Sequence, residues 1–276
     1  MGRALRAVFG ADETNLVTSW DLPDYDMTKP AISEQLARSE PDLVVNAGAW
    51  TNVDGAEANP ASAYAANALG PKFLADGCRK CGAPLVQIST NEVFFGEEGA
   101  FFYEYDMPNP RSVYARSKAA GERAVQEALP SHYVVRIAWL YGVGGNHFPA
   151  KIISAADRYG ALKVVDDEFG NPTYAVDVAF AIRELADSTR YGIYHLVNEG
   201  YTNRLELAKT VLRHAGREHV PVDPIKMADW PRPAPSPPHS VLVNQAAAAM
   251  EIRLPDWQES ISTYLALDAD RFAVPK

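Results

Sequence analysis

Apolar runs that alternate with helical segments constrain the fold of this chain more than any other feature of its sequence. Three of these runs are DLVVNAGAW from Asp42, APLVQIST from Ala83 and HYVVRIAW from His132. The segments at 59–80 and 113–129 have the pattern of helices. A strand that is apolar throughout is buried on both faces, and helices between such strands indicate a parallel sheet. We therefore predict an α/β fold with a doubly wound parallel sheet.

The rest of the chain supplies further elements of both kinds. Leu5, Val8 and Phe9 recur at the spacing of a short amphipathic helix with no strand before it, and NLVTSWD is predicted to be a strand that ends at Asp21. Further helices are predicted after Pro30 in PAISEQLARSE and at 149–158, 176–187, 203–215 and around 257–265. Further strands are predicted in LKVVDD and GIYHLV, and turns or loops are predicted in EFGNPTY and WPRPAPSPP.

Charge and composition restrict the class of partner. The formal net charge is −9 and the pI is near 5.2. Without a basic stripe, neither a nucleic acid polymer nor an anionic membrane is expected as a partner, and a small-molecule substrate is. The sequence has no apolar run long enough to span a bilayer and no signal-peptide pattern, so we predict a cytoplasmic protein. Cys78 and Cys81 form a C-x-x-C that we interpret as reduced thiols at a helix end.

Tyr114 and Lys118 are spaced Y-x-x-x-K inside the predicted helix at 113–129. A step of four residues places two side chains on one face of a helix. A lysine ammonium beside a phenol favours the phenolate, so we expect the pKa of Tyr114 to be lowered towards that of a working proton donor. Such a pair suits a carbonyl reductase, although a solvated face of a helix has the same four-residue pattern.

Five segments together carry a family resemblance: STNEVFFG at 89–96, SVYARSKAAGE at 112–122, VRIAWLYG at 135–142, VVDDEFGNPTYAVDVA at 164–179 and GIYHLV at 192–197. The chain resembles the extended short-chain dehydrogenase/reductases, and most closely the nucleotide-sugar 4-ketoreductases of the dTDP-4-dehydrorhamnose reductase type. The motifs occur in the order and spacing of that family. The resemblance implies a Rossmann-like, cofactor-binding core at 1–142 plus about 176–200, and a smaller, mainly C-terminal substrate lobe at about 143–175 plus 201–276.

The resemblance also implies a reaction and its residues. NADPH, or NADH, would reduce the 4-keto group of a dTDP-linked deoxysugar in deoxysugar biosynthesis. The catalytic residues would be Thr90, Tyr114 and Lys118, with Tyr114 as general acid and Thr90 holding the carbonyl oxygen. The matching cofactor residues are Asp26, Met27, Ala47, Gly48 and Ala49, beside Tyr114 and Lys118, and those of the substrate site are Glu92, Trp139, Gly170, Pro172 and Thr173. A plain core role for Trp139 remains an alternative. Some members form homodimers around magnesium, but no metal ligands are assigned here.

The chain departs from the family at its first residues. Members open with a strand and a G-x-x-G-x-x-G turn, whereas Met1 to Leu5 aligns with the last glycine of that turn and the following helix. The first strand is central in such a sheet, so its loss would leave two rows of backbone groups unpaired, each group costing on the order of 1–3 kcal/mol. We expect one of three explanations: the start of the sequence is placed too late, the gap in the sheet is closed by rearrangement or by an exchanged strand, or the protein folds poorly alone. A non-catalytic binding or regulatory relative without dinucleotide binding is therefore an alternative.

A second departure lies at Asn91 and Glu92, where the reductases have Asp-Tyr after the threonine. The nucleotide-sugar dehydratases have Thr-Asp-Glu here, with the two carboxyl groups acting as acid and base. Glu92 resembles that arrangement, but Asn91 cannot serve as the acid. Three interpretations stay open: a surface glutamate, a substrate contact, and an epimerase or dehydratase that works through Glu92.

Overall fold

The computed structural model describes residues 1–272, so the last four residues of the predicted substrate lobe lie outside it. Its main sheet consists of four parallel strands in the order β1-β2-β4-β9. They are β1 (Val44–Asn46), β2 (Leu85–Thr90), β4 (His132–Ile137) and β9 (Gly192–His195). Each strand falls within one of the apolar runs of the sequence. The predicted α/β fold with a parallel sheet is therefore confirmed.

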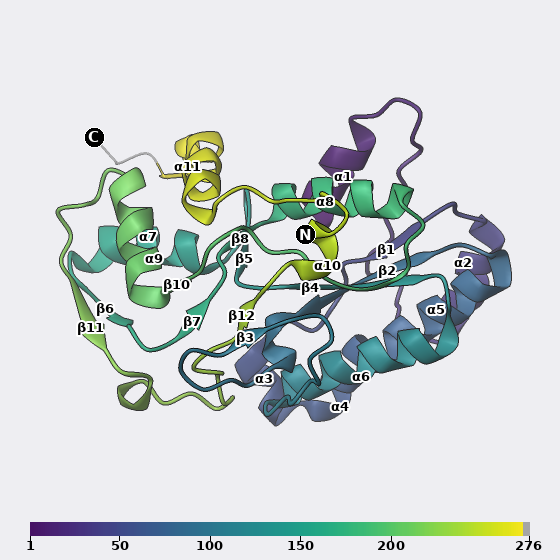
Figure 1. Cartoon of the computed structure of the whole chain (residues 1–276), viewed down its shortest axis with the longest axis horizontal. Coiled ribbons are helices and arrows are strands. Elements are labelled where there is room, and N and C mark those ends of the chain that lie inside the picture. The colour runs from purple at the N-terminus through teal and green to yellow at the C-terminus, as the bar shows by residue number, and fades with distance from the viewer. Residues whose placement is uncertain (273–276) are drawn as a thin grey trace.

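Helices cover both faces of this sheet. Figure 1 shows α1 (Gly2–Gly10) and α8 (Ala175–Asp187) on one side, and α2 (Ala31–Ser39), α5 (Gly70–Cys81) and α6 (Val113–Ala128) on the other. The helix predicted at 59–80 is interrupted, because a π-helical turn at Ala65–Leu69 separates α4 (Pro60–Tyr64) from α5. A short helix, α3 (Val53–Ala58), precedes α4.

The remaining helices and strands gather beside the carboxyl ends of the main strands. The helices are α7 (Phe148–Tyr159), α9 (Arg204–His214), α10 (Gln245–Ala248) and α11 (Trp257–Leu267). The strands are β3 (Phe101–Phe102), β5 (Leu140–Tyr141), β6 (Leu162–Val165), β7 (Phe169–Gly170), β8 (Thr173–Tyr174), β10 (Thr202–Asn203), β11 (Val222–Ile225) and β12 (Val241–Leu242). They form two-stranded pairs, so the segment EFGNPTY, predicted as a turn, contains two short strands.

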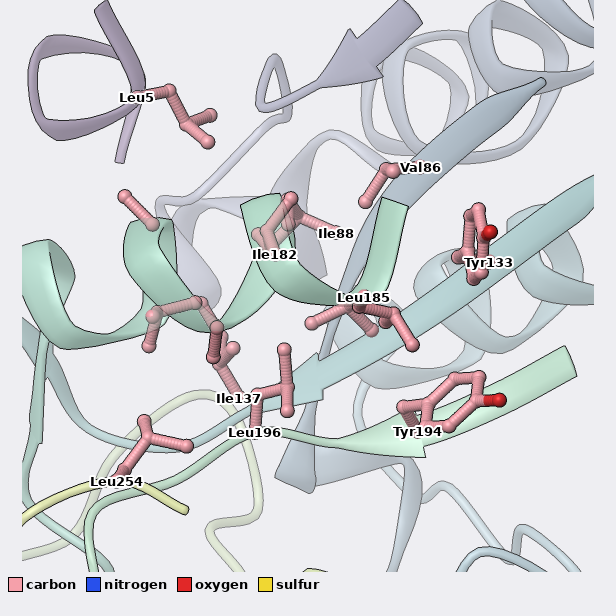
Figure 2. Packing of buried hydrophobic residues seen from close by; sticks show 14 of the residues in the cluster. Leu5, Val86, Ile88, Tyr133, Ile137, Ile182, Leu185, Tyr194, Leu196 and Leu254 are labelled. Atoms are coloured by element: carbon pink, nitrogen blue, oxygen red, sulfur yellow. The ribbon is translucent and has the colours of Figure 1, made fainter. Parts of the chain in front are cut away.

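The largest apolar cluster lies between the sheet and the α1/α8 layer. Figure 2 shows Leu5 of α1 and Ile182 and Leu185 of α8 on the same side of the sheet as Val86 and Ile88 of β2. Ile182 and Leu185 have no exposed surface, and Leu5 is 7% exposed. The predicted amphipathic helix at the start of the chain is thus confirmed, and its apolar face helps to close the core.

Helix α6 lies unusually close to the π-helical turn. A Cβ atom added at Gly121 would clash with the backbone oxygen of Asn67, so only glycine fits there. The start of α6 is fixed by Ser112, whose side chain accepts a hydrogen bond from the backbone N–H of Ala115. Both contacts fix the position of the helix that carries the Y-x-x-x-K motif.

The strand predicted for NLVTSWD is wrong. Residues 15–21 form no strand, and the side chain of Leu16 is 96% exposed. A strand needs a hydrogen-bonded neighbour, and among the described residues β1 pairs only with β2 and ends the sheet. The expected two unpaired rows inside the sheet therefore do not arise, because the segment stays outside it. Trp20 instead stacks on Tyr25, with ring centroids 4.3 Å apart.

Two further sequence predictions concern membranes and thiols. None of the helices in residues 1–272 is long and apolar enough to cross a membrane. Cys78 and Cys81 are both free and lie in the last turn of α5, as predicted. Burial raises the pKa of Cys78 to about 12, so this thiol is inert at neutral pH.

The packing of α1 can be tested with a pair of leucines near the start of the chain. Leu5→Ala is expected to lower the free energy of unfolding by about 2–5 kcal/mol, because it leaves a cavity between α1 and the sheet. Leu16→Ala, at an exposed position, is the matched control and should change it by less than about 0.5 kcal/mol. Urea unfolding measures both, and equal effects would show that α1 is not part of the core.

Candidate active site

Tyr114, Lys118 and Glu122 follow one another at four-residue steps along α6, and this face of the helix is turned towards β2. Lys118 is 4% exposed, and its Nζ donates a hydrogen bond of 2.6 Å to the backbone oxygen of Ile88. Glu122 is 2% exposed and accepts a hydrogen bond from Ser89 Oγ of the same strand. The Y-x-x-x-K pair is therefore not a solvated face of a helix.

Arg136 of β4 completes this polar layer beneath the site. Its Nη2 lies 2.8 Å from Glu122 Oε2 and its Nε lies 3.0 Å from Glu122 Oε1, and both side chains are nearly inaccessible to water. Burial and Arg136 lower the pKa of His195 to about 3, so this imidazole is neutral. Its Nδ1 donates to the backbone oxygen of Val243 at 3.1 Å, which leaves Nε2 to accept from Arg136 Nη1 at 3.4 Å.

Tyr114 is half-buried in the first turn of α6, close to Thr90 at the end of β2. Burial raises the pKa of Tyr114, the negative charge of Glu92 raises it further, and the nearby Thr90 hydroxyl partly offsets both. The pKa lowering expected from Lys118 is therefore wrong, because the ammonium is bonded to Ile88 instead. The phenol consequently stays protonated at neutral pH, which is the state that a proton donor needs.

Burial shifts the pKa of Lys118 in the opposite direction. Desolvation lowers the pKa of its ammonium to about 8, while the negative charge of Glu122 opposes this shift. The lysine is therefore largely charged at neutral pH and begins to lose its charge just above it. Glu122 supports that charge from the next turn of the helix.

Glu92 occupies a short 3₁₀ turn (Asn91–Val93) directly after β2, and its backbone N–H donates to Thr90 Oγ1 at 3.2 Å. Its Oε2 atom is buried and has no hydrogen-bond partner among the described residues. Burial, followed by the nearby charge of Glu168, raises the pKa of Glu92 to about 7, although Arg232 and Arg204 lower it in part. Glu92 is therefore not a surface glutamate. Asn91 is bonded to Ser240 through its Nδ2.

Trp139 follows β4 and adopts a left-handed backbone conformation, with φ of 39°. Such a conformation costs on the order of 1–3 kcal/mol for a bulky residue and persists only where neighbours enforce it. The Arg204 guanidinium lies 3.5 Å from the centroid of the indole ring and is itself paired with Glu168 at 2.8 Å. A Cβ atom at Gly170 would lie 2.6 Å from the same ring. Trp139 is thus held by contacts specific to this site.

Pro172 and Thr173, the other residues of the G-x-P-T segment, are buried. The hydroxyl of Thr173 donates to the backbone oxygen of Asn171 at 3.0 Å, and its backbone pairs with β5. In this structure these two residues shape the turn that brings Gly170 to Trp139. Their contact with a substrate stays a prediction.

The predicted cofactor residues meet at the end of β1. Gly48 is so close to Met27 that a Cβ atom on it would lie 3.2 Å from Met27 Sδ. Asp26 directly precedes Met27 and lies in a tight turn, where its Oδ1 accepts hydrogen bonds from the backbone N–H and the hydroxyl of Thr28. Ala47 and Ala49 flank Gly48 and are half-buried. The structure therefore brings this group together at the carboxyl edge of the sheet.

Several residues of the site were not identified from the sequence. Glu122 and Arg136 support Lys118, Arg204 covers Trp139, and Asn67 joins the loop at Trp50 to Ser117 of α6 through its side-chain amide. Glu122 extends the four-residue spacing of Tyr114 and Lys118, and this repeat could have revealed it. The others depend on contacts between distant segments. Within residues 1–272 no group of three or more His, Cys, Asp or Glu side chains is arranged to hold a metal ion.

A parallel sheet covered by helices, with a threonine, a tyrosine and a lysine at the carboxyl end of one strand, defines the class of Rossmann-type α/β oxidoreductases and epimerases. Within this class the chain belongs to the RmlD substrate binding domain family, which matches residues 1–269. The resemblance noted in the sequence is thereby confirmed.

Individual relatives agree with this assignment. A dTDP-4-dehydrorhamnose reductase of Mycobacterium tuberculosis is 41% identical over 259 residues, which cover 91% of this chain and 85% of the relative. The crystal structure of a dTDP-4-dehydrorhamnose reductase from Clostridium acetobutylicum has a TM-score of 0.92 at 35% identity, with 96% and 95% of the two chains covered. That of the Bacillus anthracis enzyme in complex with NADP has a TM-score of 0.92 at 30% identity, with the same coverage.

The buried ion pair should be essential for stability. Glu122→Gln leaves Arg136 buried without its counter-ion and is expected to cost about 3–5 kcal/mol of unfolding free energy. The double variant Glu122→Gln/Arg136→Met should recover part of that loss. Glu206→Gln, which breaks the exposed pair of Lys209 and Glu206, should cost less than about 1 kcal/mol. Unfolding in guanidinium chloride gives the free energy of unfolding of all three variants. A loss in Glu122→Gln no larger than that in Glu206→Gln would contradict the stabilising role of the buried ion pair.

Glu92 should make folding stability depend on pH. The folded protein holds a proton on this carboxyl up to about pH 7, whereas the unfolded chain releases it near 4.5. The resulting stabilisation, on the order of 1–3 kcal/mol, is complete below pH 4.5 and is lost as the pH rises through 7. Glu92→Gln, which cannot ionise, should therefore stabilise the protein relative to wild type at pH 8 but not at pH 5. Thermal unfolding at both values tests this, with exposed Glu97→Gln expected to show no such difference.

Proposed function

We propose that the protein is an NADPH-dependent nucleotide-sugar 4-ketoreductase of the dTDP-4-dehydrorhamnose reductase type. The observation that carries the proposal is the row of Tyr114, Lys118 and Glu122 along the face of α6 that is turned towards β2, where Thr90 completes the reductase set. Family membership and relatives similar over most of the chain support the substrate and its role in deoxysugar biosynthesis.

The chemistry of the reduction follows from the protonation states at the site. Bound NADPH supplies the hydride. Thr90 and Tyr114 hold the C4 carbonyl oxygen, and the protonated phenol of Tyr114 gives its proton to the oxygen as negative charge develops there. The charged Lys118, whose Nζ is hydrogen-bonded to the backbone oxygen of Ile88, would hold the nicotinamide ribose. Activity should therefore decline above about pH 8, as Lys118 loses its charge.

The cofactor residues fit a dinucleotide at the edge where they meet. Gly48 is exposed and has no side chain, so a cofactor could approach the backbone at this end of β1, where the Met27 side chain packs beside the glycine. Asp26 and Met27 would contact the adenine end, and Ala47, Gly48 and Ala49 would lie under the ribose and phosphates. A solved relative in complex with NADP supports NADPH over NADH.

The finer architecture belongs to the same proposal. The core at 1–142 plus about 176–200 would be a doubly wound, Rossmann-like cofactor domain. The segments at about 143–175 and from 201 onward would form the substrate lobe, with Glu92, Trp139, Gly170, Pro172 and Thr173 facing the sugar. A homodimer and a cytoplasmic location stay predictions.

Two alternatives differ in what they require. A dehydratase or epimerase acting through Glu92 would need a partner acid, and Asn91 is an amide held by Ser240. A non-catalytic relative would keep the pocket without binding dinucleotide. Titration of the protein with NADPH, monitored by the fluorescence of the cofactor, separates the non-catalytic alternative from the reductase. Binding of NADPH supports the reductase, and no binding at millimolar NADPH contradicts the reductase.

Tyr114→Phe is expected to lower turnover by about 10²–10⁴-fold, because the variant cannot donate the proton. Affinity for NADPH should be unchanged. Tyr105→Phe, at a residue that is 71% exposed, is the matched control and should leave turnover as in the wild type. Consumption of NADPH with a dTDP-4-keto-6-deoxyhexose measures both, and full activity of Tyr114→Phe would remove this residue from its role.

A further inference from the structure

Glu104 and Glu122, two buried glutamates of the polar layer around Arg136, are hydrogen-bonded within the protein. Glu104 Oε1 accepts from the backbone N–H groups of His195 and Ala246 at 3.2 and 3.0 Å. Glu122 is paired with Arg136 through both carboxylate oxygens. Glu92 differs, because its buried Oε2 has no partner among the described residues. A structural glutamate would be satisfied, and an unsatisfied buried oxygen costs about 1–3 kcal/mol, so this one is suited to meet a ligand.

The charged groups around Glu92 compensate its charge only in part. They are Glu168 beside β7, Arg204 at the start of α9, Arg232 of the proline-rich loop and Asp54 of α3, together with the phenol of Tyr114. Each arginine already has another carboxylate: Arg204 lies 2.8 Å from Glu168, and Arg232 lies 3.3 Å from Asp54. With a pKa raised to about 7, the Glu92 carboxyl can donate or accept a hydrogen bond near neutral pH.

The position of Glu92 specifies which part of a sugar it can meet. Its backbone is hydrogen-bonded to Thr90, and its charge acts on Tyr114, the two residues that hold the carbonyl oxygen in the proposed reaction. The next polar group on the sugar ring is the substituent of the adjacent carbon. In a 4-keto-6-deoxyhexose the adjacent C5 carries a methyl group, so the only neighbouring hydroxyl is at C3. A hydroxyl suits a carboxyl in either protonation state, because it can donate a hydrogen bond to the carboxylate and accept one from the protonated acid.

We propose that Glu92 binds the C3 hydroxyl of the ketosugar and makes the enzyme selective for substrates with a free hydroxyl next to the reacting carbonyl. This assignment rests on the proposed 4-ketoreductase function. Glu92 is then a specificity-determining residue, and hydride and proton transfer still depend on Tyr114 and Lys118. A site built to bond a hydroxyl rejects the analogue that lacks it, because its own polar group is left unpaired.

The kinetic test compares two substrates, a dTDP-4-keto-6-deoxyhexose and its 3-deoxy analogue. Wild-type protein should prefer the hydroxylated substrate by about tenfold to a hundredfold in kcat/KM. Glu92→Ala should reduce that preference to less than about threefold, whereas Glu92→Gln, which keeps a polar group, should retain much of it. Exposed Glu97→Gln should match the wild type, and NADPH affinity should be the same in all four proteins. An unchanged preference in Glu92→Ala would overturn the proposal.

A binding measurement separates this proposal from the reductase function itself. Calorimetric titration with dTDP-rhamnose and its 3-deoxy counterpart needs no turnover. Glu92→Ala should weaken binding of the first ligand at least tenfold and leave the second unchanged, and proton exchange on binding near pH 7, measured in two buffers, should vanish in Glu92→Gln. Equal losses for both ligands, or no binding of either by the wild type, would contradict the assignment. If the wild type shows the binding difference but reduces neither ketosugar, the proposed function fails and the role of Glu92 stands.

Discussion

The buried ion pair of Glu122 and Arg136 is the contact on which the site most depends. It joins α6, which carries Tyr114 and Lys118, to β4 in the middle of the sheet, and Ser89 of β2 is bonded to the same carboxylate. A buried charge is tolerated only when its partner is correctly placed, so the pair permits one position of the helix. The close approach of Gly121 to Asn67 fixes α6 on its other side. The geometry of the predicted catalytic residues therefore follows from a polar contact beneath them.

Burial sets the protonation states of the site. The same exclusion of water raises the pKa values of Tyr114 and Glu92 and lowers that of Lys118, because in each case the charged form is disfavoured. Glu122 counters this effect only at Lys118. The outcome is a protonated phenol beside a largely charged lysine, which is the combination that reduction of a carbonyl requires, and a third group, Glu92, that is balanced between its two states.

The alternation of apolar runs and helical segments predicted the sheet, its parallel strands and most helices correctly, because each of these elements is stabilised by a local pattern and a buried face. The strand expected in NLVTSWD failed for the opposite reason. Its β-branched and aromatic residues favour an extended strand, but pairing is a property of two segments, and among the described residues the neighbour it would need is not there. The short strands of EFGNPTY were missed because they pair with segments far away in the chain.

The sequence by itself determined the fold class and the family, and it predicted Thr90, Tyr114 and Lys118 as the catalytic residues, since these depend on motifs with fixed spacing. It could not determine their environment. That Lys118 bonds to Ile88, that Arg136 supports Glu122, and that Arg204 covers Trp139 are decided by segments that meet only in the folded chain. For the same reason, the pKa of Tyr114 is raised, whereas the sequence predicted that it would be lowered. Desolvation depends on everything that surrounds a group in space, and four residues of sequence do not carry that information.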